Sequence, residues 1–187
     1  AIEQTINGTA NYGNSVTCTI SRNGDLVHKM YIEHLPEDAT TADDSISYCA
    51  NYGATLIKSA ELEIGGQKID KHFGHWMEVW TELTSPNPTG AVATQIITGA
   101  NGKRTGGTLH QAVTAMGGVN GSADTNANNE GAGLMHIPLY FWFCRNPGLA
   151  LPLIALQYHE VKVKIDLETA VNPVSYTHLR AHETAYY

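Results

Sequence analysis

A chain of 187 residues with 42% hydrophobic and 16% charged residues has the composition of one globular domain, or of a large piece of one, and not of a disordered segment. Its formal net charge of −7 and its lack of any Lys/Arg run argue against direct nucleic-acid binding, which needs positive charge opposite the phosphates. No apolar run is long enough for a membrane span, and the first residues show no signal-peptide pattern. The three cysteines, Cys18, Cys49 and Cys144, form no Cys-x-x-Cys pair, so we expect buried, reduced thiols.

The first predicted element is a β-hairpin over residues 15–35. The sequence SVTCTISR places Val16, Cys18 and Ile20 on one face and hydroxyl side chains on the other, and this period of two is typical of a half-buried strand. Asn23-Gly24 is a dipeptide that tight hairpin turns favour, and residues 26–35 are the predicted partner strand.

Residues 36–53 are acidic and rich in turn-forming residues, and we expect a solvated loop because their carboxylates lack calcium-loop spacing. The segment TLIKSAELEIGG then alternates again, which predicts a strand ending at Gly65-Gly66. The following residues, QKID, are predicted to return as a short paired strand.

The apolar period then changes from two residues to that of a helix. Side chains of one stripe recur at i, i+3, i+4 and i+7 over residues 73–84: Phe73, Trp76, Met77, Trp80 and Leu83 or Thr84. We expect one short helix here, with Trp76 and Trp80 packed against the rest of the protein and Pro86 and Pro88 ending it. The opposite stripe carries His75, Glu78 and Glu82 and is predicted to be polar and exposed.

His72 and His75 raise the question of a metal site. Helical ligand pairs usually stand at i, i+4, whereas these histidines are three apart, and Gly74 between them suggests that His72 precedes the helix. No third ligand is apparent, nor is a Gly-x-Ser-x-Gly elbow or a phosphate-binding P-loop. We therefore predict no catalytic, cofactor-binding or metal-binding residue.

The second half of the chain begins with a stretch dominated by small and polar residues, 85–133, which predicts an unusually long loop. Residues 134–143 read as a buried strand, and Asn146, Pro147 and Gly148 as a turn. Residues 158–167 alternate most clearly and predict an amphipathic strand. Glycosylation sequons occur at Asn7 and Asn120 but have low weight, because such triplets arise by chance.

Residues 174–184, VSYTHLRAHET, match at every letter the translation of a transposase-type sequencing adapter. We therefore expect the natural sequence to occupy residues 1–172, and residues 174–187 to be an artefact that carries no information on the fold. His178, His182 and Glu183 are for this reason not considered as metal ligands.

Three blocks carry a family resemblance: VTCTISRNGDLVHKMYIEHLP, IGGQKIDKHFGHWMEVWTEL and IPLYFWFCRNPGLALPLIALQYHEVKVKIDLE. In this order they resemble the major capsid proteins of nucleocytoplasmic large DNA viruses, such as iridoviruses, phycodnaviruses and mimivirus relatives. The residues that carry the resemblance most visibly are Gly65, Gly66, Trp76, Trp80, Asn146, Pro147 and Gly148.

The resemblance implies an all-β fold, a jelly-roll sandwich that forms one half of a double jelly roll, here without its opening N-terminal strand. It implies a structural virion protein without enzymatic activity or cofactor, made in the host cytoplasm. Its partners would be a homotrimer, neighbouring capsomers of pseudo-hexagonal outline and minor capsid proteins. Two alternatives stay open: a carbohydrate-binding jelly-roll module, with aromatic side chains on a concave sheet face, and a cupin-like metal-dependent enzyme.

Overall fold

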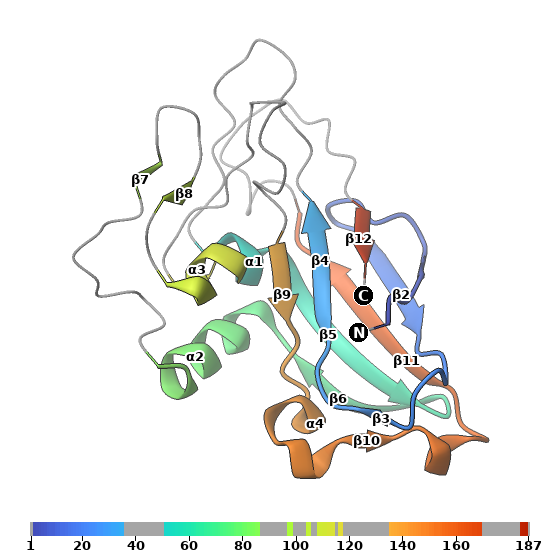
Figure 1. Cartoon of the computed structure of the whole chain (residues 1–187). Coiled ribbons are helices and arrows are strands. Elements are labelled where there is room, and N and C mark those ends of the chain that lie inside the picture. Colours follow the sequence, from blue (N-terminus) through green and yellow to red (C-terminus); the bar gives the residue numbers. More distant parts are fainter. Residues whose placement is uncertain are drawn as a thin grey trace.

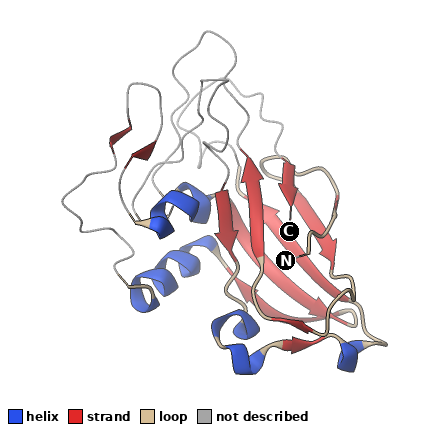
Figure 2. Cartoon of the chain, in the orientation of Figure 1, coloured by secondary structure: helices blue, strands red, loops and turns tan. Residues whose placement is uncertain are grey.

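The computed structural model describes residues 2–35, 51–86, 97–98, 104–105, 108–114, 116–117, 135–169 and 184–186. Strands of two facing layers make up most of this part, and short helices lie at one side and at one end (Figures 1 and 2). The arrangement agrees with the predicted all-β sandwich.

The larger layer is a five-stranded antiparallel sheet with the order β1-β2-β11-β5-β6. Its strands are β1 (Ile6–Asn7), β2 (Ser15–Thr19), β11 (Val161–Leu167), β5 (Ile57–Ile64) and β6 (Gln67–His72). Side chains alternate across it: along β11, Val161, Val163, Ile165 and Leu167 are buried, while the residues between them are partly or fully exposed. One face of the sheet is therefore core and the other is polar.

The facing layer is smaller and made of short pieces. The strand β4 (Tyr31–Leu35) lies between β9 (Met135–Pro138) and β12 (Thr184–Tyr186), all antiparallel. Next to this layer, β3 (Leu26–Val27) pairs with β10 (Leu151–Pro152). A separate pair joins β7 (Ile97–Thr98) to β8 (Arg104–Thr105).

The helices cluster beside β9 and below it in Figure 1. They are α1 (Tyr52–Thr55), α2 (Gly74–Thr84), α3 (Leu109–Thr114) and α4 (Trp142–Arg145), with 3-10 turns η1 (Pro147–Leu149) and η2 (Ile154–Leu156). None of the helices among the described residues is long and apolar enough to cross a membrane.

One apolar core joins the two layers. Leu62 and Val163 from the large sheet and Ile32 and Ile137 from the small one are 0% exposed. Burying one such side chain contributes about 1.5–3 kcal/mol, so this core supplies most of the favourable free energy of folding. The sandwich is a rigid support on which the helices and loops are placed.

The predicted strands are largely confirmed, but the predicted hairpin over 15–35 is wrong. The strand β2 pairs with β1 and β11, whereas β3 and β4 pair with strands of the other layer. A tight turn of the type expected at Asn23-Gly24 needs positive φ at both residues, and neither residue has it. The chain therefore crosses between the layers at this point instead of folding back.

The second predicted hairpin is confirmed. Gly65 and Gly66 both have positive φ, 58° and 83°, and the turn joins β5 to β6 as an antiparallel pair. The predicted strand over 158–167 is found as β11, which begins at Val161, and the predicted strand over 134–143 ends at Pro138, before α4. The long predicted loop over 85–133 contains helix α3, which no apolar period had indicated.

Candidate functional site

The helix α2 and its surroundings are the candidate site, because they hold most of the residues that the sequence singled out. The helix was predicted over 73–84 and is found over Gly74–Thr84. Phe73 precedes it in extended conformation, and Ser85 follows it in the same conformation next to Pro86. The element is therefore confirmed, while the face that it buries differs from the prediction.

The buried face of α2 consists of Gly74, Met77 and Thr81. Of the predicted apolar stripe only Met77 is fully buried; Phe73 is 51% and Leu83 74% exposed. The cause is the close approach at Gly74, where a Cβ atom would run into the backbone carbonyl oxygens of Ala54 and Ile57. This contact rotates the helix so that the glycine, and not a tryptophan, faces the core.

Trp76 and Trp80 are half-buried and lie beneath an arginine from another element. The Arg145 guanidinium, at the end of α4, is 5.7 Å from the Trp76 ring centre and 4.8 Å from that of Trp80. The two indoles are 5.8 Å apart, and the Arg145 Nε–H donates to the Tyr140 carbonyl at 3.1 Å. We call Trp76, Trp80 and Arg145 the Trp–Arg cluster; each cation–π contact of this kind contributes about 0.5–1 kcal/mol at exposed sites.

The predicted polar stripe of α2 is only partly exposed. His75 and Glu82 face solvent, but Glu78 is half-buried and its Oε1 accepts a hydrogen bond from the Gly117 backbone N–H at 3.1 Å. Burial raises the pKa of the Glu78 carboxyl, which the Gly117 hydrogen bond partly offsets. Glu78 therefore ties α2 to the segment after α3, and the expectation of a fully exposed acidic stripe is wrong at this residue.

His72 lies apart from His75, as the sequence suggested. It is the last residue of β6 and is 4% exposed, and its ring stands edge-on to Phe141 at 4.7 Å. The Tyr140 backbone N–H donates to His72 Nε2 at 3.5 Å, and burial lowers the pKa of His72 to about 4. Since His75 points into solvent, the two rings do not converge; within the described ranges no three His, Cys, Asp or Glu side chains gather as metal ligands do.

The remaining predicted residues stand in turns. Gly65 N–H donates to the Glu160 carbonyl at 2.9 Å, and a Cβ on Gly65 would lie 2.7 Å from His159 Nδ1. Asn146 Oδ1 accepts from the Gly148 N–H at 2.9 Å and so caps the turn that begins at Pro147. These residues therefore shape the backbone at two sheet ends.

Several other predictions lie partly or wholly outside the described residues. Asn7 is exposed on the edge strand β1, whereas Asn120 is outside the described ranges. Cys18 and Cys144 are buried, as expected, and burial raises the pKa of each thiol to about 11. Cys49, the acidic loop carboxylates and the histidines of the tail lie outside the described residues.

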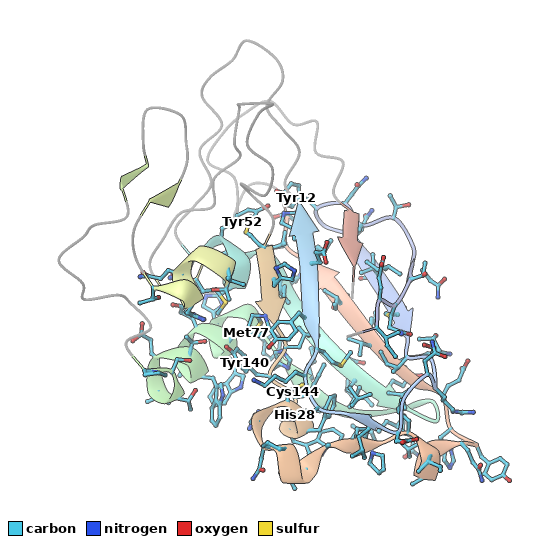
Figure 3. The ribbon with its side chains drawn as sticks, viewed as in Figure 1. Tyr12, His28, Tyr52, Met77, Tyr140 and Cys144 are labelled. Atoms are coloured by element: carbon cyan, nitrogen blue, oxygen red, sulfur yellow. The ribbon has the colours of Figure 1, made fainter. Side chains whose placement is uncertain are left out.

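Sequence reasoning missed a buried polar chain near one end of the sandwich. Tyr12 and Tyr52, labelled in Figure 3, share a hydrogen bond between their hydroxyls at 2.7 Å. His34 Nε2 lies 2.9 Å from the Tyr52 hydroxyl. His34 is 1% exposed, and burial lowers its pKa to about 4. The three residues come from distant segments, so the only local signal was a histidine at an inward position of a strand.

Comparison with known proteins places these features in a family. The family model described as "Major capsid protein N-terminus" matches residues 1–184. The chain is 43% identical to the major capsid protein of Pyramimonas orientalis virus, over 89% of this chain and 37% of that protein. It is 34% identical to the major capsid protein of Paramecium bursaria Chlorella virus 1, over 94% of this chain and 34% of that protein.

Solved structures agree with the sequence relatives. The crystal structure of PBCV-1 VP54, fitted into a reconstruction of the virophage Sputnik, superposes with a TM-score of 0.61 at 32% identity, over 99% of this chain and 39% of that one. The Faustovirus major capsid protein, at 15% identity and a TM-score of 0.52, supports the jelly-roll fold alone. The chain spans only about a third of the length of its curated relatives, 37% and 34% in the two cases above. It belongs to the major capsid protein family of large DNA viruses and matches the N-terminal part of that family.

Proposed function

We propose that this chain is the N-terminal jelly-roll portion of a structural capsid subunit. The full-length subunit forms a homotrimer, the trimer is a pseudo-hexagonal capsomer, and capsomers pack with one another and with minor capsid proteins into the virion shell. The observation that carries this proposal is the family match over residues 1–184, together with the superposition on the quasi-atomic model of the PBCV-1 virus capsid over 99% of the chain. Synthesis in the host cytoplasm is part of the same proposal.

The large sheet supports a structural role through its outer face. The Glu61 carboxylate forms ion pairs with Lys68 at 2.6 Å and with Lys71 at 3.5 Å, and these contacts lower the pKa of Glu61. Asp166 accepts hydrogen bonds from Ser15 and Ser59; although burial alone raises the pKa of this carboxyl, the hydrogen bonds lower it. Cross-strand contacts of this kind hold the strands in register on the polar face.

The carbohydrate-binding alternative requires an aromatic platform on a sheet face. The strands β2, β5 and β11, with the sequences SVTCT, IKSAELEI and VKVKIDL, contain no aromatic residue. The described outer face of the large sheet is thus charged and hydroxylated, which favours the structural role.

The outer face of α2 is the surface that we propose for contact with a neighbouring subunit. Val79 and Leu83 stand one turn apart on it and are 48% and 74% exposed, and the Trp–Arg cluster lies beside them. Aromatic residues and arginine are enriched where protein surfaces bind one another. Here Arg145 contacts both indole rings before any partner binds, which favours a preformed contact surface.

The test is the oligomeric state of the full-length protein. Multi-angle light scattering is expected to give the mass of a trimer, and negative-stain microscopy a pseudo-hexagonal outline. A monomeric full-length protein at concentrations at which shells assemble would contradict the proposal.

A pair of variants then tests the α2 surface. The double variant Val79→Ser, Leu83→Ser is expected to raise the protein concentration needed for trimer formation or capsomer packing by at least about tenfold. The control is Tyr158→Ser, at a residue that is 87% exposed and lies outside α2, and it is expected to leave both unchanged. Equal assembly of the α2 double variant and the control would remove α2 from the interface.

A further inference from the structure

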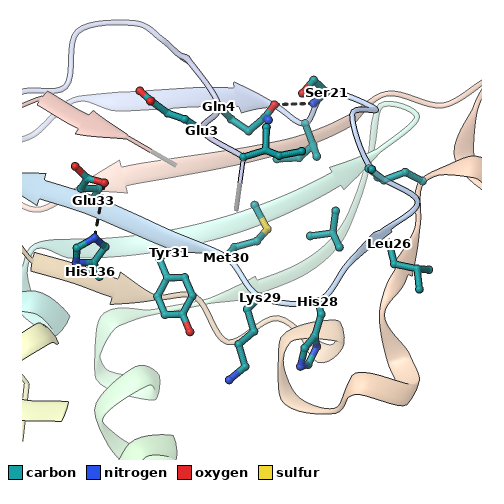
Figure 4. Close-up of a pocket in the computed structure, with 15 residues that line it drawn as sticks. Glu3, Gln4, Ser21, Leu26, His28, Lys29, Met30, Tyr31, Glu33 and His136 are labelled. Carbon is teal, nitrogen blue, oxygen red and sulfur yellow. Dashed lines mark hydrogen bonds and ion pairs between the residues drawn. The ribbon is translucent and has the colours of Figure 1, made fainter. Parts of the chain in front are cut away.

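The bend at Asn23-Gly24, where the chain crosses between the two layers, is an exposed loop that is held at both ends. On one side the Ser21 N–H donates to Gln4 Oε1 at 2.8 Å, as Figure 4 shows. On the other side the Asp25 carbonyl accepts from the Leu153 N–H at 2.9 Å. The residues between these two anchors are all exposed, so the tip of the bend is free while its ends are fixed.

The backbone nitrogen of Gly24 is open to attack chemistry, because nothing crowds it. Glycine has no side chain, and a Cβ atom at Gly24 would meet nothing within 4 Å. Within the described residues the Gly24 N–H donates no backbone hydrogen bond. Ser21 and Gly24 also line an open groove of about 610 Å³ beside β4 (Figure 4), which gives water access to this nitrogen.

The side chain of Asn23 is held by a weak contact. Its Nδ2 donates to Ser21 Oγ at 3.0 Å, and both residues are exposed. An exposed hydrogen bond between two side chains exchanges readily with water, so the Asn23 side chain is free to rotate. Rotation brings its Cγ atom to the nitrogen of the next residue, which closes a five-membered ring.

We propose that Asn23 is a site of spontaneous deamidation. The Gly24 nitrogen gives its proton to hydroxide and attacks Asn23 Cγ; the new N–C bond forms a cyclic imide, and the Cγ–Nδ2 bond breaks as ammonia leaves with a proton from water. Water then adds to one of the two imide carbonyls and reopens the ring as aspartate or as isoaspartate. Each event replaces a neutral amide with a negative charge, and no oxidant, reductant or cofactor takes part.

The dipeptide Asn7-Gly8 has the same chemistry but not the same freedom. Asn7 is paired with Thr17 in β1, and Gly8 has a φ of 116°. A Cβ atom on Gly8 would lie 3.5 Å from the Ser15 carbonyl oxygen of β2, so this glycine is packed against the sheet. Ring closure requires a backbone rotation that the sheet opposes, and deamidation at Asn7 is therefore expected to be slow.

The products would change the contacts of Arg22. Its guanidinium donates to the carbonyls of Leu156 and His159 at 3.2 and 3.4 Å, which ties the crossing chain to η2. A new carboxylate at residue 23 competes for this guanidinium, and isoaspartate also lengthens the main chain between the two anchors by one methylene group. Asn23 lies between β2 and β3, so both sheets are expected to stay intact.

Peptide mapping by mass spectrometry tests this site on the full-length protein, kept for weeks in mildly alkaline buffer. Deamidation raises the mass of a peptide by about one dalton, and labelling by an isoaspartyl methyltransferase identifies the isoaspartate. The quantity compared is the ratio of the deamidation rate at Asn23 to that at Asn7, in the folded protein and in urea. We expect this ratio to be at least about tenfold larger in the folded protein, because unfolding frees both dipeptides equally. A ratio that folding leaves unchanged or lowers would overturn the proposal.

A variant tests the nucleophile. In Gly24→Ala the added methyl group meets open space, so the fold is kept, but it crowds the nitrogen of residue 24. We expect deamidation at Asn23 to slow by at least about tenfold, while Asn7 keeps its rate as the internal control. If Asn23 reacts as fast in this variant as in the parent protein, the Gly24 nitrogen is not the nucleophile and the proposal is wrong. The reaction needs water and an exposed dipeptide and no contact between subunits, so it stands or fails separately from the proposed capsid function.

Discussion

Gly74 sets the position of helix α2, because its missing Cβ lets the helix backbone touch the carbonyls of Ala54 and Ile57. Gly74 is the first residue of α2, and a Cβ atom there would overlap both carbonyl oxygens, so packing accounts for a glycine at this position. The position of α2 therefore depends on the lack of a side chain at Gly74.

Substitution of this glycine tests the close approach. We expect Gly74→Ala to lower the free energy of unfolding by about 3 kcal/mol, since neither carbonyl can move without disturbing its own helix or strand. Gly24→Ala is the matched control: it meets no atom within 4 Å and is expected to change stability by less than about 0.5 kcal/mol. Urea unfolding followed by circular dichroism measures both; equal effects would show that α2 tolerates a side chain at Gly74.

Two buried histidines, His34 and His72, predict how stability depends on pH. Burial lowers the pKa of each to about 4 from an ordinary value of 6.5, so the unfolded chain takes up their protons first as pH falls. Their contribution is fully present above pH 6.5 and is lost between about pH 6.5 and 4, at about 1.4 kcal/mol per pH unit for each histidine. Glu78 opposes this trend, because its raised pKa makes the folded state the better proton acceptor.

Substitution separates the contribution of each histidine to the pH dependence of stability. His34→Gln is expected to reduce the pH dependence of unfolding between pH 6 and 4.5, while the exposed His75→Gln leaves it unchanged. Stability curves at several pH values give the slope directly. An unchanged slope in the His34 variant would mean that this ring is protonated in the folded protein.

At the scale of elements, α2 separates what a helical period can predict from what it cannot. The spacing of Phe73, Trp76, Met77, Trp80 and Leu83 correctly predicted the helix. It did not reveal which side of the wide apolar stripe faces inward, because that depends on Gly74 and on Arg145 of α4, a partner that is remote in sequence.

Truncation of two members of this stripe should therefore have very different effects. Met77→Ala is expected to destabilise the chain by about 3 kcal/mol, because the side chain is 0% exposed and leaves a cavity. Leu83→Ala, at a residue that is 74% exposed, should change stability by less than about 0.5 kcal/mol. A reversed order in chemical unfolding would show that the predicted stripe, and not the Gly74 face, packs against the sandwich.

The two predicted hairpin turns also differ in whether the sequence predicted them correctly. Gly65-Gly66 was predicted correctly, because the dipeptide and the two alternating strands around it lie within one short stretch. Asn23-Gly24 offered an equally good local signal, but β2 and β4 belong to different layers, and their pairing depends on β11 and β9 from the end of the chain. Local chemistry permits a hairpin; the remote strands decide whether one forms.

For the whole molecule, composition and alternation were enough to predict an all-β sandwich, and three sequence blocks were enough to indicate its family. The buried chain from Tyr12 through Tyr52 to His34 and the open groove at β4 could not be predicted, since both arise where distant segments meet. The predicted artefact over 174–187 remains a prediction, and β12 lies within it.

Ending the chain at residue 173 tests the role of that tail. Removal of β12 leaves the β4 edge unpaired from Tyr31 to Leu35, and unpaired edges promote association between chains. We expect the shortened chain to form more oligomers as its concentration rises, in light-scattering measurements, and Tyr31→Lys on the same edge to suppress them. A shortened chain that associates no more than the 187-residue chain would show that β12 does not protect the β4 edge.

The Trp–Arg cluster has a practical consequence for spectroscopy. All three tryptophans, Trp76, Trp80 and Trp142, lie on α2 and α4, at one end of the molecule. Tryptophan emission therefore reports on this end alone, and it should shift when a neighbouring subunit covers α2. The protein thus carries a natural optical probe of contact at α2.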